Sequence, residues 1–360
     1  MRAQVIRLLL AALASSSTLY LIISISNFSD SFGDIAWDDV VDAVPLECSA
    51  PRTASIGHAC IPNTVHYVLL KKDTKSEPTF SFRQWLSLYS SVAILKADII
   101  LLHTDYEDHE ILVAATGGSK WTRKVLTEFP RVKINHIQAP IIANDKVITS
   151  TEHKSDFVRM NVLHKFGGIY MDWDVLALQD VTPLRKSGFA AVVGREAFGG
   201  INNGVIMAQK KSMLIAMMRC EGPKAFDGSW TAHSVELLTQ LAERMVRQIG
   251  EVLILDQKAF APVSFGRKGA EELFESHHSP DNLATRRRNE TVHFTPSWEI
   301  DLSSTYLLHA FHRREKEVKG FSGVNLSCVL NRTSNYALAA YPIVKHALEL
   351  GLLTKEDVEY

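Results

Sequence analysis

The segment from Gly167 to Asp174 constrains this chain more than any other stretch of its sequence. It reads Gly-Gly-Ile-Tyr-Met-Asp-Trp-Asp, so two glycines precede a short apolar run and two carboxylates follow it. A short apolar run between a turn and acidic residues is typical of a buried strand. Asp172 and Asp174 then lie where that strand surfaces, in its period-2 register. Carboxylates in such a place suit Mg²⁺ or Mn²⁺, which bridge to substrate phosphates.

The overall composition indicates a globular protein without general affinity for nucleic acid. The chain has 360 residues, 46% of them apolar, which is enough for one large domain or two ordinary ones with a substantial core. Its formal net charge is −1. Contacts to nucleic-acid phosphates need a basic surface, so we expect no nucleic-acid partner.

The N-terminal segment has the length and polarity of a membrane anchor. Residues 8–29 carry no charge and meet the roughly 20 residues of a spanning helix. The basic residues Arg2 and Arg7 lie on its N-terminal side, so the positive-inside rule places the body of the chain in the lumen. We therefore expect a cytosolic tip and transmembrane signal anchor over residues 1–29 and a lumenal stem over residues 30–60.

A cleaved signal peptide is the alternative for the same segment. The run Ala12-Leu13-Ala14 resembles a cleavage site after a short apolar core. The apolar stretch resumes at Leu19, which favours the anchor. Either interpretation places the body of the chain in the secretory pathway.

Sequons and cysteines agree with that compartment. The chain has four cysteines, an even number that is compatible with disulfides, and Cys48 and Cys60 are spaced to close a short loop. Three sequons downstream of the anchor predict N-glycosylation at Asn289, Asn325 and Asn331.

Strands and helices alternate along the body of the chain, which predicts an α/β fold with parallel crossovers. Ser155 is expected to cap a helix over residues 156–166, and Gly167 to end it. Asp156 and Arg159 are three residues apart on this helix, so they share one face. The other expected elements are a helix over residues 82–95 and strands over residues 64–70, 97–103, 132–137, 190–194 and 204–208.

The run from Ser155 to Val175 resembles the DXD region of a glycosyltransferase family. This family includes fungal Golgi α-1,6-mannosyltransferases and animal α-1,4-galactosyl- and α-1,4-N-acetylglucosaminyltransferases. The resemblance covers a Ser-Asp-x-x-Arg helix, a Gly-Gly-x-Tyr turn and two acids at fixed distances. It implies a GT-A fold over residues 61–360, which is a Rossmann-like nucleotide-binding mixed sheet flanked by helices.

The resemblance also implies roles for individual residues. Asp174 corresponds to a direct ligand of a divalent metal, Mn²⁺ or Mg²⁺, and Asp172 to a contact with the ribose and the metal shell. Asp156 and Arg159 correspond to the pair that holds the donor sugar, and Tyr170 to the aromatic residue that shapes its pocket.

Segments outside the DXD region add further candidates. Thr305 to His312 resembles a closing segment in which a histidine approaches the metal; His309 fits this register best and His312 is the alternative. Asn203 lies in a segment that resembles the family's segments flanking the donor and acceptor pockets, which implies a contact with the donor. The chain departs from the family in having Trp173 between the two acids and no tryptophan in its first strand, which leaves Tyr67 as the candidate for stacking on the base.

The resulting hypothesis is a metal-dependent, retaining glycosyltransferase in the Golgi membrane. It would move a sugar from a nucleotide diphosphate donor, with a UDP-sugar favoured, to a hydroxyl of a glycan on a glycolipid or glycoprotein. One alternative is a non-catalytic protein that binds glycans or acts as a scaffold. Another is a haloacid-dehalogenase-type phosphatase, in which Asp172 would be the nucleophile, but Leu176 stands where that class has Thr or Val.

Overall fold

The computed structural model describes residues 60–277, 296–319 and 321–358 of the chain. The expected anchor over residues 1–29, the sequon at Asn289 and, apart from Cys60, the expected stem lie outside the described residues. None of the helices in the described ranges is long and apolar enough to cross a membrane.

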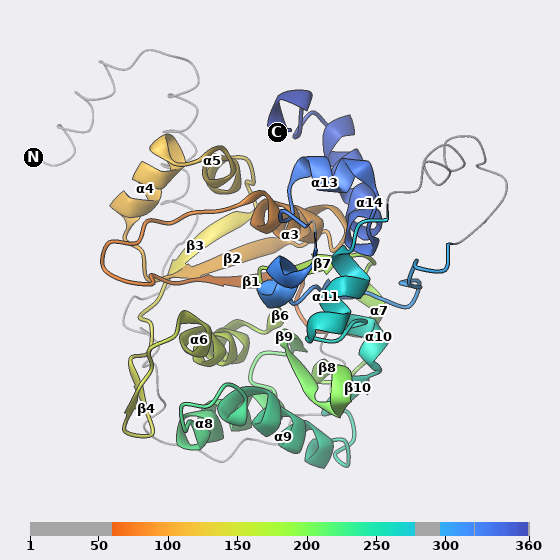
Figure 1. The fold of residues 1–360 in the computed structure, drawn as a ribbon. Coiled ribbons are helices and arrows are strands. Elements are labelled where there is room, and N and C mark those ends of the chain that lie inside the picture. Colours follow the sequence, from red (N-terminus) through yellow and green to blue (C-terminus); the bar gives the residue numbers. More distant parts are fainter. Residues whose placement is uncertain (1–59, 278–295, 320, 359–360) are drawn as a thin grey trace, which may run out of the picture. The chain divides into compact units, whose positions relative to one another are not determined.

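A seven-stranded mixed sheet forms the centre of the described part of the chain (Figure 1). Its strand order is β10-β8-β9-β6-β1-β2-β3. Every neighbouring pair is parallel except those of β9, which is antiparallel to both β6 and β8. The expected α/β class is therefore confirmed. The strands are β1 (Thr64–Leu69), β2 (Ile99–Thr104), β3 (Val132–His136), β6 (Gly168–Met171), β8 (Ala191–Arg195), β9 (Ile201–Ala208) and β10 (Val252–Leu255).

Helices cover both faces of this sheet (Figure 1). Buried side chains of α3 and α14 pack with Val65 and Tyr67 of β1 on one face, and those of α6, α8 and α9 pack with Val68 on the other. This division follows from the alternation of side chains along a strand. The helices are α3 (Phe82–Ala93), α6 (Thr151–Phe166), α8 (Met213–Ala225), α9 (Leu237–Met245) and α14 (Asn335–Glu349).

Shorter elements complete the two layers. Helix α3 joins the parallel strands β1 and β2, which confirms the expected crossover. The remaining helical elements are α4 (Asp108–Gly117), α5 (Lys120–Thr127), α7 (Thr182–Arg185), α10 (Gln257–Phe260), α11 (Arg267–Phe274), α13 (Leu326–Asn331), η2 (Ala197–Gly199), η3 (Ala232–Glu236), η4 (His312–Glu317) and η5 (Lys355–Asp357). The remaining strands are β4 (Ile142–Ala143), β5 (Lys146–Val147), β7 (Val175–Ala177) and β11 (Leu307–His309).

The reversed direction of β9 decides what lies beside the acidic segment. In the parallel strands around it, carboxyl ends share one edge of the sheet, and this edge is where ligands bind in α/β proteins. Because β9 runs the other way, its first residues lie at this edge, and the Asp172 N–H donates to the Gly204 carbonyl over 2.9 Å. The strand begins at Ile201, earlier than the expected Gly204, because Ile201 already pairs with Arg195 of β8.

The helix before the acidic segment also begins earlier than expected. Its N-cap is Ser150, whose side chain accepts a hydrogen bond from the His153 N–H, rather than Ser155. The Ser155 hydroxyl instead lies 3.1 Å from the Tyr170 hydroxyl. The expected end is confirmed, because Gly167 is the C-cap with a φ of 65°.

A chain of buried side chains ties the acidic strand to its neighbours. His66 Nε2 lies 2.7 Å from the Gly167 carbonyl oxygen and must therefore donate to it. His66 Nδ1 then accepts from His103 Nε2 over 2.9 Å, and His103 Nδ1 accepts from the Asn135 amide over 2.9 Å. Both imidazoles are neutral in this arrangement, which runs from Gly167, the residue before β6, through β1 and β2 to β3.

Cysteines and sequons are placed as follows. Cys60 is a free, exposed cysteine, so the disulfide that the spacing from Cys48 allowed is wrong, and Cys328 is also free. Asn331 is exposed at the end of α13, whereas the Asn325 side chain caps the start of the same helix by accepting from the Cys328 N–H. Glycosylation at these two asparagines stays a prediction.

We expect Gly168→Ala to destabilise the protein by about 3 kcal/mol or more. Gly168 has a φ of 115°, and an added Cβ would lie 2.4 Å from the Thr64 carbonyl oxygen. Gly188→Ala is the matched control, because its φ is 86° but nothing lies within 4 Å of an added Cβ. It should cost about 1 kcal/mol from backbone strain alone. Urea unfolding of both variants measures this, and equal losses would contradict the role of close packing at Gly168.

The His66 chain predicts a loss of stability in acid. Burial lowers the pKa of His66 from 6.5 to about 4, against the hydrogen bond to Gly167. His66 therefore becomes protonated below pH 6.5 in the unfolded chain, but only below about pH 4 in the folded chain. Stability should fall across this window by about 3 kcal/mol from His66. Urea unfolding at pH 7 and pH 5 should show a smaller difference for His66→Gln than for the wild type; an equal difference would disprove this origin.

Candidate metal and donor site

The segment after β6 directs its two carboxylates to one side and its tryptophan to the other. The Trp173 ring stacks on Tyr67 with a centroid distance of 4.4 Å, and its indole N–H donates to the Val68 carbonyl over 2.7 Å. Trp173 thus packs against the end of β1. Asp172 and Asp174 flank it and face the opposite side, as the period-2 register predicts.

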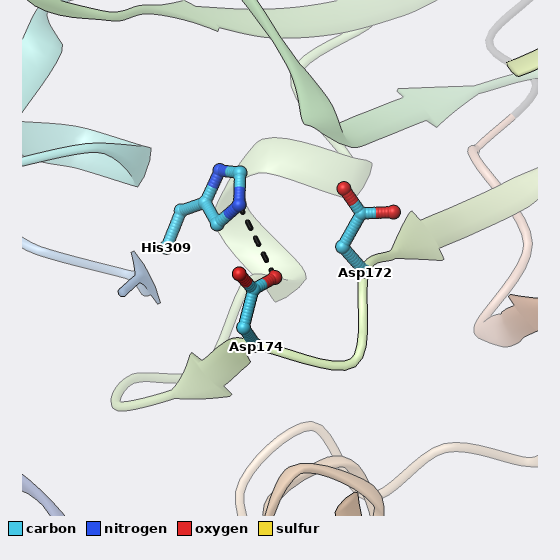
Figure 2. Close-up of side chains that lie close together, drawn as sticks. All are labelled: Asp172, Asp174 and His309. Atoms are coloured by element: carbon cyan, nitrogen blue, oxygen red, sulfur yellow. Dashed lines mark ion pairs between the residues drawn. The ribbon is translucent and has the colours of Figure 1, made fainter. Parts of the chain in front are cut away.

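His309 joins the two carboxylates in one cluster (Figure 2). Each of Asp172, Asp174 and His309 offers a ligand atom, and these atoms lie within 4.8 Å of one another. His309 Nε2 forms an ion pair with Asp174 Oδ1 over 3.2 Å. Strand β11 brings His309 here by pairing with β7, in a register that sets His309 opposite Val175, the residue after Asp174.

His312 contacts the cluster through its backbone rather than its ring. Its N–H donates to Asp174 Oδ2 over 3.2 Å, while its imidazole Nδ1 contacts the Glu315 carboxylate. Glu315 is in turn paired with Arg83 at 3.2 Å. Of the two candidate histidines, the structure therefore brings the ring of His309 to the carboxylates and turns that of His312 toward Glu315.

Gly204 forms the floor of the cluster. A Cβ at this position would lie 2.5 Å from His309 Cε1 and 2.8 Å from Asp172 Oδ2, so any side chain here would displace the ligand atoms. Beside Gly204, the His309 Nδ1–H donates to Asn202 Oδ1 over 3.2 Å, while the Asn202 amide nitrogen donates to Glu196 over 3.2 Å. Asn202 thereby orients the imidazole so that Nε2 faces Asp174.

Arg159 connects the cluster to a second group of polar side chains. Its guanidinium is buried and pairs with Asp156 at 3.1 Å and with Asp172 at 3.2 Å. It also donates to the Asn203 carbonyl over 2.5 Å. The predicted proximity of Asp156 and Arg159 on one helix face is correct, and the structure adds Asp172 as their shared neighbour.

Asp156 is held by two further residues. The Asn203 amide donates to Asp156 Oδ1 over 2.7 Å, and His233 Nε2 lies 3.0 Å from Asp156 Oδ2. His233 is fully buried as a side chain and comes from η3, a π-helical turn before α9. His233 is not among the residues predicted from the sequence, because no local motif surrounds it.

The two tyrosine candidates lie in different places. The Tyr170 hydroxyl donates to Asp172 Oδ1 over 2.6 Å, and the Arg159 guanidinium lies 4.4 Å from the centre of the Tyr170 ring. Tyr170 therefore helps to fix the orientation of the Asp172 carboxylate. Tyr67 is fully buried beneath Trp173, with its hydroxyl 2.8 Å from Ser91 Oγ, and the structure does not bring it to the acidic cluster.

Burial and mutual charge set the protonation of the cluster. Burial raises the pKa of Asp172, against the charge of Arg159 and with added repulsion from Asp174. Burial alone would also raise the pKa of Asp174, but the charge of His309 holds it well below its usual range. Burial alone would lower the pKa of His309, but Asp174 raises it above its usual value. Asp174 and His309 thus stabilise each other's charged forms.

This donor set fits a divalent cation. Two carboxylates and one imidazole are ligands that Mn²⁺ accepts, and few protein ligands are typical where substrate phosphates complete the shell. The lack of a side chain at Gly204 lets His309 and Asp172 approach each other, and Asn202 Oδ1 accepts from the outer nitrogen of His309. His309 would lose its proton on binding, because metal ligands must be deprotonated.

A comparison with protein families decides the nature of this region. Residues 67–190 match the family described as "Glycosyltransferase sugar-binding region containing DXD motif". The chain carries a DXD-type glycosyltransferase region. The resemblance noted in the sequence is confirmed over these residues. This match gives the phosphatase alternative no support.

Two curated relatives share parts of the chain. Glucan organizing enzyme 1 of Cryptococcus neoformans var. grubii is 24% identical over 213 residues, which are 56% of this chain and 54% of that protein. An uncharacterized protein of Arabidopsis thaliana is 31% identical over 96 residues, which are 26% of this chain and 14% of that protein. The chain thus spans about half the length of the first relative and less of the second.

Solved glycosyltransferase structures align with this chain at low identity. The glycosyltransferase GlyE of Streptococcus pneumoniae is 14% identical, with a TM-score of 0.40, over 81% of this chain and 64% of that chain. The galactosyltransferase LgtC, solved in complex with donor and acceptor sugar analogs, is 14% identical, with a TM-score of 0.36, over 81% of this chain and 98% of that chain.

We expect Arg159→Met to destabilise the protein by about 3–5 kcal/mol, because Asp156 and Asp172 would keep buried negative charges without their shared cation. Arg267→Met is the control, since its pair with Glu271 on α11 is exposed and screened by solvent, so its loss should change stability little. Urea unfolding at pH 7 measures both. Similar small losses in the two variants would show that Arg159 does not hold the carboxylates together.

Proposed function

We propose that this protein is a metal-dependent glycosyltransferase that uses a nucleotide diphosphate sugar, with a UDP-sugar favoured. The observation that carries the proposal is the convergence of Asp172, Asp174 and His309 within a region that matches DXD glycosyltransferases. These three side chains would hold Mn²⁺ or Mg²⁺. The cation would offset the negative charge that develops on the departing nucleoside diphosphate.

The network around Arg159 would hold the donor sugar. Arg159 and His233 hold the Asp156 carboxylate in place. The Asp156 carboxylate accepts hydrogen bonds, whereas the Asn203 amide donates them. A sugar hydroxyl both donates and accepts, so this pair suits it. Tyr170 lies beneath Asp172 and would keep the carboxylate directed toward the ribose and metal shell.

The transfer itself exchanges one bond for another. The bond between the anomeric carbon and the diphosphate oxygen breaks, and a bond from the same carbon to the acceptor oxygen forms. The acceptor's proton passes to the departing phosphate if the acceptor enters from the same face, so no protein base is required. This front-face route retains the anomeric configuration, and we include retention in the proposal.

The fold family and the location belong to the same proposal. The strand order, with one reversed strand beside the acidic segment, supports a GT-A fold. The apolar segment over residues 8–29 and the sequons support a single-pass type II protein of the Golgi membrane with its body in the lumen. The acceptor would be a glycan on a glycolipid or glycoprotein.

The non-catalytic alternative predicts binding without turnover. A scaffold or glycan-binding protein would retain the fold but would not hydrolyse or transfer the donor. The full chain should therefore be offered a panel of UDP- and GDP-sugars with Mn²⁺, and both protection against thermal unfolding and release of nucleoside diphosphate should be measured. The donor should raise the melting temperature because it binds the folded state. Protection without release over hours would favour the alternative.

We expect Asp174→Asn to reduce metal-dependent donor turnover by roughly a hundredfold or more, because the variant removes a charged ligand while keeping the shape of the side chain. Asp145→Asn is the control, an exposed residue of the turn between β4 and β5 with a φ of 57°, which Asn readily adopts. Nucleoside diphosphate release with and without Mn²⁺ measures both variants. Full activity of a folded Asp174→Asn protein would disprove the assignment of Asp174 as a metal ligand.

A further inference from the structure

Three phenylalanines form a row that begins at His309, in the cluster that this residue forms with Asp172 and Asp174. Phe311 stacks on the His309 ring with a centroid distance of 3.9 Å. Phe265 meets Phe311 edge-on at 6.2 Å, and Phe198 meets Phe265 edge-on at 5.7 Å. The three come from separate parts of the chain: the segment after β11, the loop before α11 and the loop between β8 and β9. We call them the phenylalanine row.

The row becomes more exposed with distance from the cluster. Phe311 is partly buried, Phe265 is 45% exposed and Phe198 is 90% exposed. Adjoining apolar rings at a surface favour burial against a ligand, because water solvates them poorly. Since its inner end contacts His309, the row leads from solvent to the reacting centre.

The backbone holds two of these rings in place at some cost. Phe198 has φ 68° and ψ 13°, and Phe311 has φ 46° and ψ 53°, so both lie in the left-handed region that bulky residues seldom adopt. The loop of Phe198 is fixed by hydrogen bonds from the Glu196 N–H to the Gly200 carbonyl at 2.7 Å and from the Arg195 guanidinium to the Gly199 carbonyl at 2.6 Å. Strain of this kind is concentrated at functional sites.

We propose that the phenylalanine row is the acceptor subsite and binds a chain of neutral hexopyranose units by stacking. This inference rests on the proposed function and names the face from which the acceptor reaches the cluster. A pyranose ring packs its C–H groups on an aromatic ring and leaves its hydroxyls free for polar partners. Both needs are met here, because Glu196, two residues before Phe198, reaches the Asn202 amide beside His309.

The shape of the row favours a glycan over a lipid surface. The rings follow one another in single file, each touching the next at its edge, and the file ends at charged side chains. A glycan chain matches such a file, since each successive sugar can use one ring. Membrane binding instead requires a broad apolar face bordered by basic residues.

The test is direct binding of neutral oligosaccharides to the full chain without donor. Maltoheptaose, laminarihexaose and α-1,6-mannohexaose should be titrated against the wild type, Phe198→Ala and Phe265→Ala, with saturation-transfer NMR or calorimetry. At least one oligosaccharide should bind the wild type, and each alanine variant should weaken its affinity about tenfold. Phe198→Tyr keeps the ring and should restore most of the affinity.

The control is Ile249→Ala, another exposed apolar residue, 93% exposed and before β10, which should bind like the wild type. Melting temperatures verify that the alanine variants are folded. Equal affinity of Phe198→Ala and the wild type would overturn the proposal, as would the absence of binding by all three oligosaccharides at millimolar concentration. Binding of phosphatidylcholine vesicles that depends on Phe198, without oligosaccharide binding, would also overturn it.

These outcomes are separable from those of the donor experiments. Nucleoside diphosphate release by the wild type tests the proposed function and needs no oligosaccharide. If donor turnover is absent but the oligosaccharide binds through Phe198, the transferase proposal fails and the glycan subsite stands. If donor turnover is present but Phe198→Ala binds like the wild type, only the phenylalanine row is refuted.

Discussion

The site depends on the ion pairs of the buried Arg159 guanidinium with Asp156 and Asp172. The guanidinium joins α6, the segment after β6 and the start of β9 through Asp156, Asp172 and the Asn203 carbonyl. Burial of such charges costs solvation, and a well-packed apolar group in their place would often be as stable. The network therefore serves mainly to fix the positions of the Asp156 and Asp172 carboxylates. It separates a carboxylate that faces the metal cluster from one that faces the proposed sugar pocket.

The cluster of Asp172, Asp174 and His309 depends instead on the two-stranded ribbon of β7 and β11. This ribbon joins residues that are far apart in the chain, and its register fixes His309 against Asp174. The backbone also contributes, because the N–H groups of Ala310 and His312 donate to the Asp174 carbonyl and carboxylate. Asp174 is thus held from its main chain and its side chain at once.

Much of this was predictable from local sequence. The alternation of apolar runs and glycines predicted the α/β class and most strands, since these patterns report burial directly. The spacing of Asp156 and Arg159 predicted their shared face, and the period-2 register predicted that Asp172 and Asp174 point the same way. The helix start at Ser150 was missed because Thr149, Thr151 and Ser155 lie close to it, and each is an acceptable cap. Tyr67 was expected near the base, but nothing in its strand reveals that Trp173 covers it.

Other residues could not be predicted from one sequence. His233 has no motif around it and reaches Asp156 only because η3 packs against α6. Gly204 lies against His309 and Asp172 only because β9 runs antiparallel to β6. Such contacts depend on tertiary structure, and no periodicity carries their signal. His309 was predicted from the resemblance to the glycosyltransferase family, but the β7–β11 ribbon that positions it was not predicted.

The reversed strand β9 has a consequence for how such proteins diversify. Because β8 and β9 form a hairpin, their connecting loop over residues 196–200 lies beside the metal cluster, yet it is closed by its own hydrogen bonds. We expect substitutions in this loop to leave the register of the sheet unchanged, because the pairs between β8 and β9 lie outside it. The surface around the cluster can therefore change while Asp172 and Asp174 stay in place, so that, under the proposed function, one scaffold would serve different acceptors.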